Sequence, residues 1–321
     1  MRTCWLMTAI LGLLVAAGGA HAQPKYPTKP IRLMVPFPPG GTPDIVARML
    51  AQKLSETFKQ PVVVDNRPGG GGAIGTEAAV RANPDGYTMI VVSAAYAANA
   101  ALYKLPYDPV NEVAPIALIG EAGFVVTLHP SLPVMTIKDL IAYDKANPGK
   151  LNYGSGGTGT AVHLATELFN QMAGTKMTHV PYKGTGPALN ELLGGQIQLI
   201  IGTMPQMIPQ VKSNRVRGIA VTTAKRSNAM PNIPTVAETV PGYEAVTWAA
   251  ILGPQALPKD IVARWSREID RILQLPDVKE RMAGDGMEPA GGSPERLREV
   301  LKREVAKWQK VVKIANIKPG S

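Results

Sequence analysis

The sequence predicts an α/β protein of two lobes joined by a hinge of two crossing strands. Short apolar runs rich in β-branched residues alternate with helical patterns, which is the rhythm of βαβ units in an open, mostly parallel sheet. Two longer apolar stretches have the composition of strands that cross between lobes. The chain of 321 residues also exceeds the size at which a single hydrophobic core usually stops growing, so two lobes are favoured over one large sheet.

The expected strands follow one another along the chain, with helical patterns or turn residues between them. Each is a short run dominated by residues that favour strands, and Gly, Pro, Asn or Asp bound many of them. Their ranges are Ile31–Val35, Val62–Val64, Thr88–Ser93, Ile116–Gly120, Val125–Leu128, Leu151–Tyr153, Thr178–Val180, Leu199–Gly202 and Gly218–Thr222.

The hinge is predicted where the apolar, strand-like stretches are longest. One is Ala114–Leu128, broken at Gly120–Gly123, and the other is Tyr243–Leu252, which ends in Gly253-Pro254. If both stretches cross between lobes, residues 23–121 and 247–321 form lobe 1, and residues 122–246 form lobe 2. The alternative is that both stretches are ordinary strands of a single domain.

The first residues, 1–22, have the pattern of a secretory signal peptide. A basic start is followed by an apolar run from Trp5 to Ala17 and by the small-x-small cleavage site Ala20-His21-Ala22. We therefore expect an exported, periplasmic protein. The chain's one cysteine, Cys4, lies within this segment, so the mature protein needs no disulfide, thiol nucleophile or cysteine-bound metal.

The formal net charge of +10 suits an anionic partner, and its distribution argues against nucleic acid. No basic run has interleaved aromatic residues. The most basic stretch, Ser293–Lys313, contains acidic residues and predicts a surface helix, with Leu297, Leu301, Val305, Trp308 and Val312 as its apolar stripe. A small anionic molecule is the better expectation.

The first candidate site is the turn in VPFPPGGTPDIVARMLAQKL, which begins at Val35. Thr42 is a suitable N-cap, Pro43 a favoured first helical residue and Asp44 a good first-turn acid, so Gly40-Gly41 is expected at a helix N-terminus. Backbone N–H groups and the positive end of the helix dipole favour an anion there. The alternative is a tight turn with nothing bound.

A second turn, Gly154–Thr160, repeats this arrangement in the other predicted lobe. It follows a strand and precedes a helix over Ala161–Met172, with Ala161, Ala165, Leu168 and Met172 expected on one face. Ser155, Thr158 and Thr160 offer hydroxyl donors, and His163, one turn in, either faces the cleft or packs. Two such turns can close on one small anion from both sides.

Other chemistry has weaker support in the sequence. Both Gly154-x-Gly156-x-x-Gly159 and an earlier copy at Gly70–Gly75 match a dinucleotide fingerprint but lack the acid that must follow at the end of the next strand. Ser155 suggests an exported serine hydrolase of small esters or amides, yet Tyr153 stands where a nucleophile elbow needs glycine. His129, His163 and His179 show no metal-ligand spacing and no link to an acid.

The mature chain closely resembles the Bug family, the periplasmic solute-binding proteins of tripartite tricarboxylate transporters. The resemblance runs from Pro24 to about Ile317 and is carried by many ordered blocks. They are Pro27–Pro30, Val35-Pro36-Phe37 with Gly40-Gly41 and Asp44, Val64–Gly69, Pro84–Thr88, Tyr153–Thr160 with His163, Val180–Gly184, Gly194-Gly195-Gln196, Ile233–Val236 with Glu238, and the closing tryptophan helix.

This resemblance implies a two-lobed, type II periplasmic-binding-protein fold that closes over a small carboxylate and delivers it to a membrane permease. We expect a monomer without catalytic residues, cofactor or metal. In the family, two loops grip one carboxylate, partly through water; they match Phe37–Thr42 and Ser155–Thr160 here. The candidate ligand-binding residues are Phe37, Gly40, Gly41, Thr42, Asp44, Ser93, Ala94, Tyr96, Ser155, Gly157, Thr158, Gly159, Thr160, His163, Tyr182 and Thr203.

Two departures from the family pattern bear on the ligand. Ser93–Ala100 is rich in small residues and has alanine where relatives commonly follow Asn99 with proline, and Ile197-Gln198 replaces a frequent valine-aspartate pair. The first change suggests room for a bulkier ligand such as an aromatic acid. Tyr96 is then either a stacking wall or a core residue, and Asp44 is either a cleft residue or an ordinary first-turn acid.

Three classes of protein make different predictions. A transport receptor binds a carboxylate without turnover, a hydrolase loses turnover with Ser155→Ala, and a scaffold has neither ligand nor hinge. The paired glycine turns favour the receptor. We expect Gly157→Glu to keep the fold and abolish binding, because its carboxylate occupies the place of the ligand's.

Overall fold

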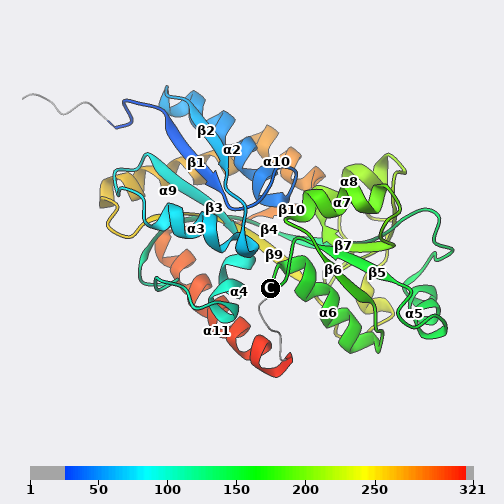
Figure 1. Ribbon diagram of the computed structural model, residues 1–321. Helices are drawn as coiled ribbons and strands as arrows, with labels where there is room; N and C mark the ends of the chain where they lie inside the picture. Colours follow the sequence, from blue (N-terminus) through cyan, green and yellow to red (C-terminus); the bar gives the residue numbers. More distant parts are fainter. Residues whose placement is uncertain (1–25, 316–321) are drawn as a thin grey trace, which may run out of the picture.

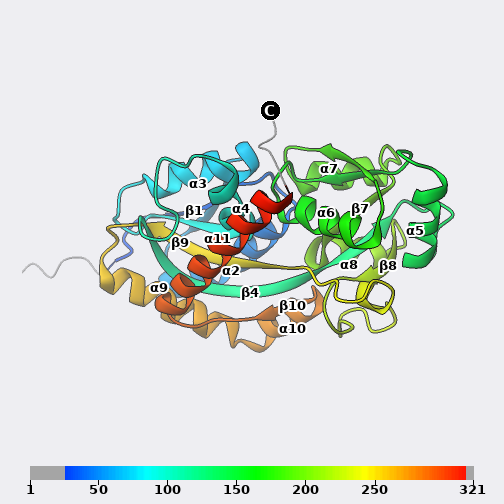
Figure 2. The same cartoon turned by 90° about the horizontal axis from the view of Figure 1, so that it is seen from below.

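The computed structural model describes residues 26–315 and contains two α/β units joined by two long strands (Figure 1). The predicted signal peptide, residues 1–22, lies outside the described range. The joining strands are β4 (Val113–Leu128) and β9 (Val246–Pro254), which pair antiparallel and run from one unit into the other in Figure 2. The fold is the mixed α/β architecture that the sequence predicts.

The first unit contains the sheet order β2-β1-β3-β9-β4. Strand β1 is parallel to β2 and β3, whereas β9 is antiparallel to β3. Its elements are β1 (Ile31–Val35), α2 (Thr42–Phe58), β2 (Val62–Asn66), a 3₁₀ turn η1 (Gly70–Gly72), α3 (Ala73–Val80), β3 (Thr88–Ser93), α4 (Ala95–Leu102), α9 (Lys259–Leu273), α10 (Pro276–Gly284), β10 (Met287–Pro289) and α11 (Pro294–Ala315).

The second unit is built on the second half of β4. Strands β7 and β8 are antiparallel to β4, and β5 is parallel to β6 and β7. Its elements are α5 (Ile137–Ala146), β5 (Asn152–Ser155), α6 (Ala161–Ala173), β6 (Thr178–Pro181), α7 (Thr185–Leu193), β7 (Leu199–Thr203), α8 (Met204–Lys212), β8 (Arg217–Val221) and a 3₁₀ turn η2 (Val236–Glu238).

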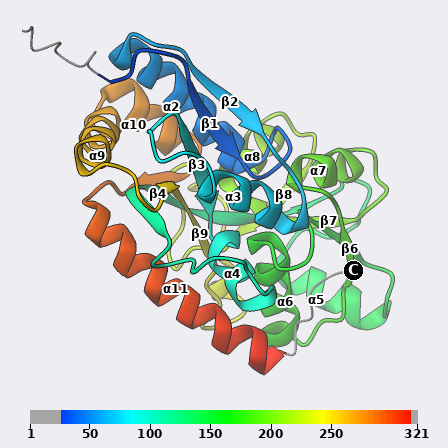
Figure 3. The same ribbon diagram turned by 60° about the vertical axis from the view of Figure 1, so that its left-hand side comes forward.

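Each unit has its own hydrophobic core. In the second unit the buried apolar side chains between Phe124 and Tyr243 form one cluster. In the first unit the alternation of a strand divides the core: Leu33 of β1 belongs to the cluster with α2 and α9, and Met34 to the cluster with α4 and α11. Helix α11, in red in Figure 3, packs against α4 and β4, with Leu297 and Leu301 fully buried as its predicted stripe requires.

Strand β4 corrects one prediction. The expected break at Gly120–Gly123 is absent, and β4 is continuous over 16 residues. The two glycines instead permit close approach of other segments: a Cβ at Gly120 would lie 2.6 Å from the carbonyl oxygen of Glu288, and one at Gly123 would lie 2.6 Å from a methyl group of Thr223. Glycine inside a strand marks close backbone approach here rather than a turn.

Helix α6 corrects another. Its predicted apolar face included Met172, which is 39% exposed, whereas Val162 and Phe169 point into the core beside Ala165. The buried face of α6 is therefore rotated about the helix axis relative to the predicted one. It also includes the polar residues His163 and Thr166, which an apolar pattern does not mark. Among the described residues, no helix is both long and apolar enough to cross a membrane.

Candidate ligand-binding site

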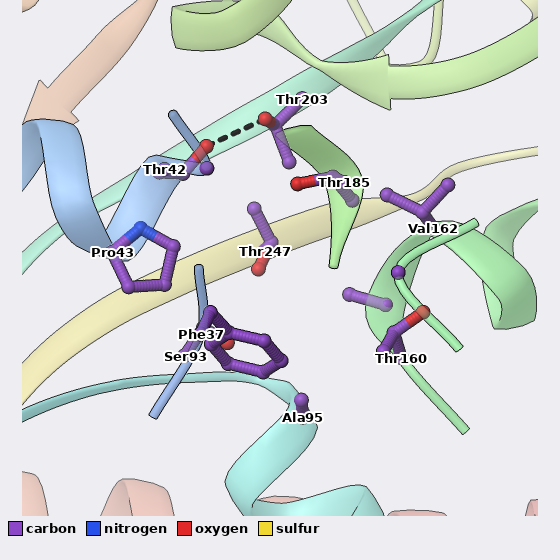
Figure 4. A pocket seen from close by; sticks show the side chains of 13 residues that line it. Phe37, Thr42, Pro43, Ser93, Ala95, Thr160, Val162, Thr185, Thr203 and Thr247 are labelled. Carbon is purple, nitrogen blue, oxygen red and sulfur yellow. Dashed lines mark hydrogen bonds between the residues drawn. The ribbon is translucent and has the colours of Figure 1, made fainter. Parts of the chain in front are cut away.

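A cavity lies between the two units, next to the strands that join them (Figure 4). It holds about 440 Å³ of space not filled by protein atoms, part of it open to solvent. Its lining comes from both units and from β9, and includes Phe37, Gly41, Thr42, Pro43, Ser93, Ala95, Gly156, Thr160, Ala161, Val162, Thr185, Thr203 and Thr247.

The N-termini of five helices converge on this cavity. They belong to α2, α4, α6, α7 and α8, represented in the lining by Thr42, Ala95, Ala161, Thr185 and the N-cap Thr203. Each helix start presents unpaired N–H groups and the positive end of a dipole. The lining contains no charged side chain, so the positive potential of the cavity comes from peptide dipoles.

Hydroxyl groups complete the polar lining. Six side chains supply them: Thr42, Ser93, Thr160, Thr185, Thr203 and Thr247. The Thr42 and Thr203 hydroxyls are 2.5 Å apart and link the first unit to the second, as the dashed line in Figure 4 shows. A carboxylate only accepts hydrogen bonds, so a hydroxyl that binds it must donate. The Thr160 hydroxyl already donates to the carbonyl oxygen of Gly157 at 2.8 Å.

The two units are in close contact around the cavity. A Cβ at Gly184 would lie 2.5 Å from Pro38, and one at Gly186 would lie 2.5 Å from the carbonyl oxygen of Pro39. The loop after β1 and the start of α7 therefore lie in direct contact across the two units.

The first glycine loop is held by Asp44 from beneath. The Gly40 N–H donates to the Asp44 carboxylate at 3.0 Å, and Arg48 and Asn66 donate to the same carboxylate at 2.9 and 3.0 Å. Burial raises the pKa of Asp44, but the hydrogen bonds from Arg48, Gly40 and Asn66 together hold it below its ordinary value of 3.8. Asp44 is 3% exposed and does not line the cavity.

The N-terminus of α2 differs by one residue from the prediction. Gly41, with an extended backbone, is the N-cap, and Thr42 is the first helical residue. Thr42 cannot cap because its hydroxyl is directed to Thr203 across the cavity. The N–H groups of Gly41 and Thr42 make no hydrogen bond to other described residues, so they are free to bind a ligand.

The second glycine loop is held by neutral aromatic side chains. The Gly157 N–H donates to the Ser155 hydroxyl at 3.1 Å, and that hydroxyl lies 2.6 Å from Nε2 of His179. The Gly159 N–H donates to Nδ1 of His163 at 3.1 Å. The His163 and His179 rings stack at 4.1 Å, and Tyr153 stacks on His179 at 4.9 Å.

Burial keeps these imidazoles uncharged. Burial, followed by the neighbouring His163, lowers the pKa of His179 to about 3, and burial also lowers the pKa of His163. Because Nδ1 of His163 accepts from Gly159, the ring proton belongs on its other nitrogen. The loop thus depends on two neutral histidines as hydrogen-bond partners.

The structure divides the predicted site residues into two groups. Six line the cavity: Phe37, Gly41, Thr42, Ser93, Thr160 and Thr203. Six do not line the cavity but form the hydrogen bonds that hold the glycine loops: Gly40, Asp44, Ser155, Gly157, Gly159 and His163. Ala94 is buried, Thr158 and Tyr182 are partly buried, and all three lie outside the lining.

Tyr96 is a core residue rather than a wall of the main cavity. It is 3% exposed, and its hydroxyl donates to the carbonyl oxygen of Pro109 at 2.6 Å. The first-turn position of Tyr96 in α4 directs the ring away from the helix start and into the core of the first unit.

Sequence reasoning missed Thr185 and Thr247 as lining residues. Thr185 begins α7 directly after Gly184, which follows β6, so it belongs to a third strand–glycine–helix turn whose signal was present in Val180–Gly184. Thr247 lies on β9, where no turn or cap marks it. Only the antiparallel pairing of β9 with β4 brings it under the cavity.

Comparison with known proteins gives a consistent result. A family model described as tripartite tricarboxylate transporter family receptor matches residues 46–317. Protein BugT of Bordetella pertussis is 35% identical, over 96% of each chain. The structure of Rpa4515 of R. palustris with adipate is 37% identical, with a TM-score of 0.89, over 92% of this chain and 100% of that one.

A more distant structure carries a different ligand. MatC (Rpa3494) from Rhodopseudomonas palustris with bound malate is 28% identical, with a TM-score of 0.84, over 89% of this chain and 100% of the other. These findings overturn the hydrolase alternative, because the matched family is one of solute receptors. Ser155 is also 0% exposed, and no described carboxylate is hydrogen-bonded to His179, so the Ser155–His179 pair is structural.

Proposed function

The chain belongs to the receptor family of tripartite tricarboxylate transporters, as its resemblance to Bug proteins predicted, and we propose that it binds a small organic acid between its two units. It is a solute receptor and not an enzyme. The observation that carries the proposal is the convergence of five helix N-termini on one cavity without a charged side chain in its lining.

This arrangement suits a carboxylate better than a cation or a neutral solute. The N-terminus of a helix favours a negative charge by roughly 0.3–1 kcal/mol when exposed and by up to about 2 kcal/mol when partly buried. Hydrogen bonds to an ionised oxygen are also roughly twice as strong as those to a neutral one. The free N–H groups of Gly41 and Thr42, and those of Ala161 and Val162 at the start of α6, are the donors that we assign to the carboxylate.

Among the predicted residues, we assign ligand contact to the six that line the cavity and loop support to the six that hold the glycine loops. Phe37 supplies the apolar side of the site, and the Thr160 and Thr203 hydroxyls belong to the second unit. The adipate and malate carried by the two related structures support a carboxylate as the ligand class.

We propose that the two units are the predicted lobes, residues 23–121 with 247–321 and residues 122–246, and we assign the hinge to β4 and β9. Separate hydrophobic cores support this division, because each unit can move without repacking the other. Thr247 of β9 lines the cavity, so a bound ligand touches the hinge itself. Ligand contacts to both units favour the closed state.

The family implies a transporter partner in the membrane, and we propose that the closed, loaded receptor delivers its acid to those permease subunits. We further propose that the protein is a periplasmic monomer, exported by the signal peptide at residues 1–22, and that nucleic acid is not a partner. The basic residues of α11 support this, because they share the helix with acidic residues and surround an apolar stripe that is buried.

A thermal-shift screen against aliphatic and aromatic mono-, di- and tricarboxylates tests the proposed function. A ligand present at about 100 times its dissociation constant adds roughly 2.7 kcal/mol of stability. We expect one acid to raise the midpoint clearly and its uncharged amide to have no effect. A flat response to every acid, or an equal response to acids and amides, would contradict the proposal.

A further inference from the structure

A second, smaller cavity lies behind the Phe37 ring. It holds about 160 Å³ of space not filled by protein atoms, part of it open to solvent, and is lined by Pro36, Phe37, Gly71, Gly72, Thr76, Val92, Ser93, Tyr96 and Asn99. Phe37 and Ser93 also line the main cavity, and Figure 4 shows their side chains next to each other there. The half-buried Phe37 ring is therefore the partition between the two spaces.

Most polar atoms around this small cavity already have partners. The Thr76 hydroxyl donates to the carbonyl oxygen of Gly72 at 2.7 Å, and the Tyr96 hydroxyl is directed out of the cavity to Pro109. The Asn99 side-chain nitrogen donates to the carbonyl oxygen of Gly71 at 3.0 Å. These bonds fix the cavity walls and leave those groups unable to bind a guest.

One acceptor of this lining is both buried and without a partner among the described residues. Oδ1 of Asn99 is buried and makes no hydrogen bond to a described residue, and the whole side chain is only 4% exposed. The neighbouring nitrogen bond to Gly71 fixes which end of the amide is oxygen. A buried acceptor without a donor is unfavourable, so this position calls for a donor from outside the chain.

The backbone beside this buried acceptor is glycine, so no side chain occupies the space next to it. A Cβ at Gly71 would lie 3.4 Å from Oδ1 of Asn99, and one at Gly72 would lie 3.0 Å from the Phe37 ring. Both glycines have positive φ, at 61° and 99°, which other residues rarely adopt. Side chains at these positions would fill the space that the cavity keeps open.

The cavity disfavours a second negative charge. Its walls are largely apolar, its lining contains no lysine or arginine, and its free acceptor repels a carboxylate. This contrasts with the main cavity, where the helix N-termini converge. The two spaces therefore differ in the charge they accept.

We infer that the cavity behind Phe37 is a second subsite, which receives the far end of the ligand when the Phe37 ring turns aside. It selects a neutral hydrogen-bond donor, such as a hydroxyl group, over a second carboxylate. The inference rests on the proposed function, since the carboxylate in the main cavity is what aims the far end of the ligand at Asn99.

Calorimetric titration with matched ligands tests this subsite. For each chain length, the straight-chain monocarboxylate, its ω-hydroxy derivative and the corresponding dicarboxylate are compared. At the best length we expect the ω-hydroxy acid to bind about tenfold more tightly than the other two, which is about 1.4 kcal/mol. Equal affinities, or tighter binding of the dicarboxylate, would overturn the subsite while leaving the main site intact. Failure of every acid to bind would remove the proposed function as well.

Variants of Asn99 test whether this residue causes the preference for the ω-hydroxy acid. Asn99→Leu removes the acceptor, and we expect it to abolish the preference for the ω-hydroxy acid. If this variant does not fold, Asn99→Asp keeps an acceptor and adds charge, and we expect it to shift the preference toward the ω-amino acid. Tyr96→Phe is the matched control, because Tyr96 lines the same cavity but its hydroxyl is used elsewhere. A preference that survives Asn99→Leu, or one that Tyr96→Phe abolishes, would contradict the assignment.

Discussion

The two glycine loops resemble each other in sequence and differ in what holds them. The loop of the first unit is tied to a carboxylate, because Asp44 accepts from Gly40, Arg48 and Asn66. The loop of the second unit is tied to uncharged groups: Gly157 donates to the Ser155 hydroxyl, which lies against His179, and Gly159 donates to the His163 ring. Both supports consume N–H groups that the sequence pattern assigns to the ligand.

The comparison shows that the glycine turn alone does not supply all the N–H donors of an anion site. Several of its N–H groups are spent on fixing the loop, and the donors left for the ligand come from the next residues, at the helix start. The first loop places a negative charge beneath its own anion site, compensated by Arg48. The second loop avoids any such charge, so changes at the two loops should have distinct consequences.

The largest effect is expected from a charge placed inside the cavity. Gly41 has φ of −85° and ψ of 165°, which any residue adopts, and its Cβ would point toward the Thr185 hydroxyl, 3.1 Å away. Gly41→Asp is therefore compatible with the fold and with helix capping. Because like charges brought together cost several kcal/mol, we expect it to weaken carboxylate binding at least about 100-fold.

Gly284→Asp is the control for this variant, since a Cβ there meets nothing within 4 Å. It should bind normally. Gly41→Asp improves on the Gly157→Glu variant that the sequence suggests, because Gly157 has φ of 115° and would be strained by any side chain. A folded Gly41→Asp protein that still binds the acid tightly would place the ligand elsewhere.

The support of the first loop is expected to matter next. Asp44→Asn removes the carboxylate charge that accepts hydrogen bonds from Arg48 and from the Gly40 N–H, so Arg48 loses its ion-pair partner. Weakening a buried, charge-assisted network costs roughly 1–3 kcal/mol. Chemical denaturation should show this loss of unfolding free energy. Arg48→Met should lose less, because the Arg48 side chain is 54% exposed. Equal stability of Asp44→Asn and wild type would contradict the role of Asp44.

The contact between units should have a smaller effect, and one that is not additive. Thr42→Val and Thr203→Val each break the hydrogen bond across the cavity and leave one buried hydroxyl unpaired, so each should weaken binding about tenfold. The double variant should be no worse than either single variant. Additive losses would show that the two hydroxyls act separately.

The two supports also respond to acid in different ranges of pH. The folded pKa of Asp44 lies below its ordinary value of 3.8, so its contribution is full above that value and is lost only as the pH falls through the folded pKa. The folded pKa of His179 is about 3 against an ordinary 6.5, and neutral His179 likewise favours the folded state. Its contribution declines already as the pH falls below 6.5 and is gone near 3.

Between pH 6.5 and 4, acid therefore weakens the second loop first. Stability measured over this range should fall, and His179→Gln should flatten the slope by about one proton taken up on unfolding. The Asp44→Asn variant should keep the wild-type slope in the same range. A His179→Gln protein with the wild-type slope would mean that other groups govern the acid response.

The fold was largely predictable because local patterns specify it. The bounds of β1 and β3, the start of α6 and the stripe of α11 follow from periodicity and from turn residues. The continuity of β4 was not predictable, since Gly120 and Gly123 read as a turn until the segments that approach them are known.

The site was predictable in kind and less so in detail. Strand–glycine–helix turns predict Gly41, Thr42 and Thr160 as site residues, and all three line the cavity. The partners that consume the other N–H groups lie far away in sequence: Asn66 is 22 residues from Asp44, and His179 is 24 residues from Ser155. Thr247 joins the lining only through sheet pairing, which no local pattern encodes.

The most direct test is a crystal structure with the tightest-binding acid from the thermal-shift screen. The account predicts carboxylate oxygens within about 2.7–3.2 Å of the backbone nitrogens of Gly41 or Thr42 from one unit and of Ala161 or Val162 from the other. A ligand whose carboxylate is held by lysine or arginine side chains, or that contacts one unit alone, would contradict it.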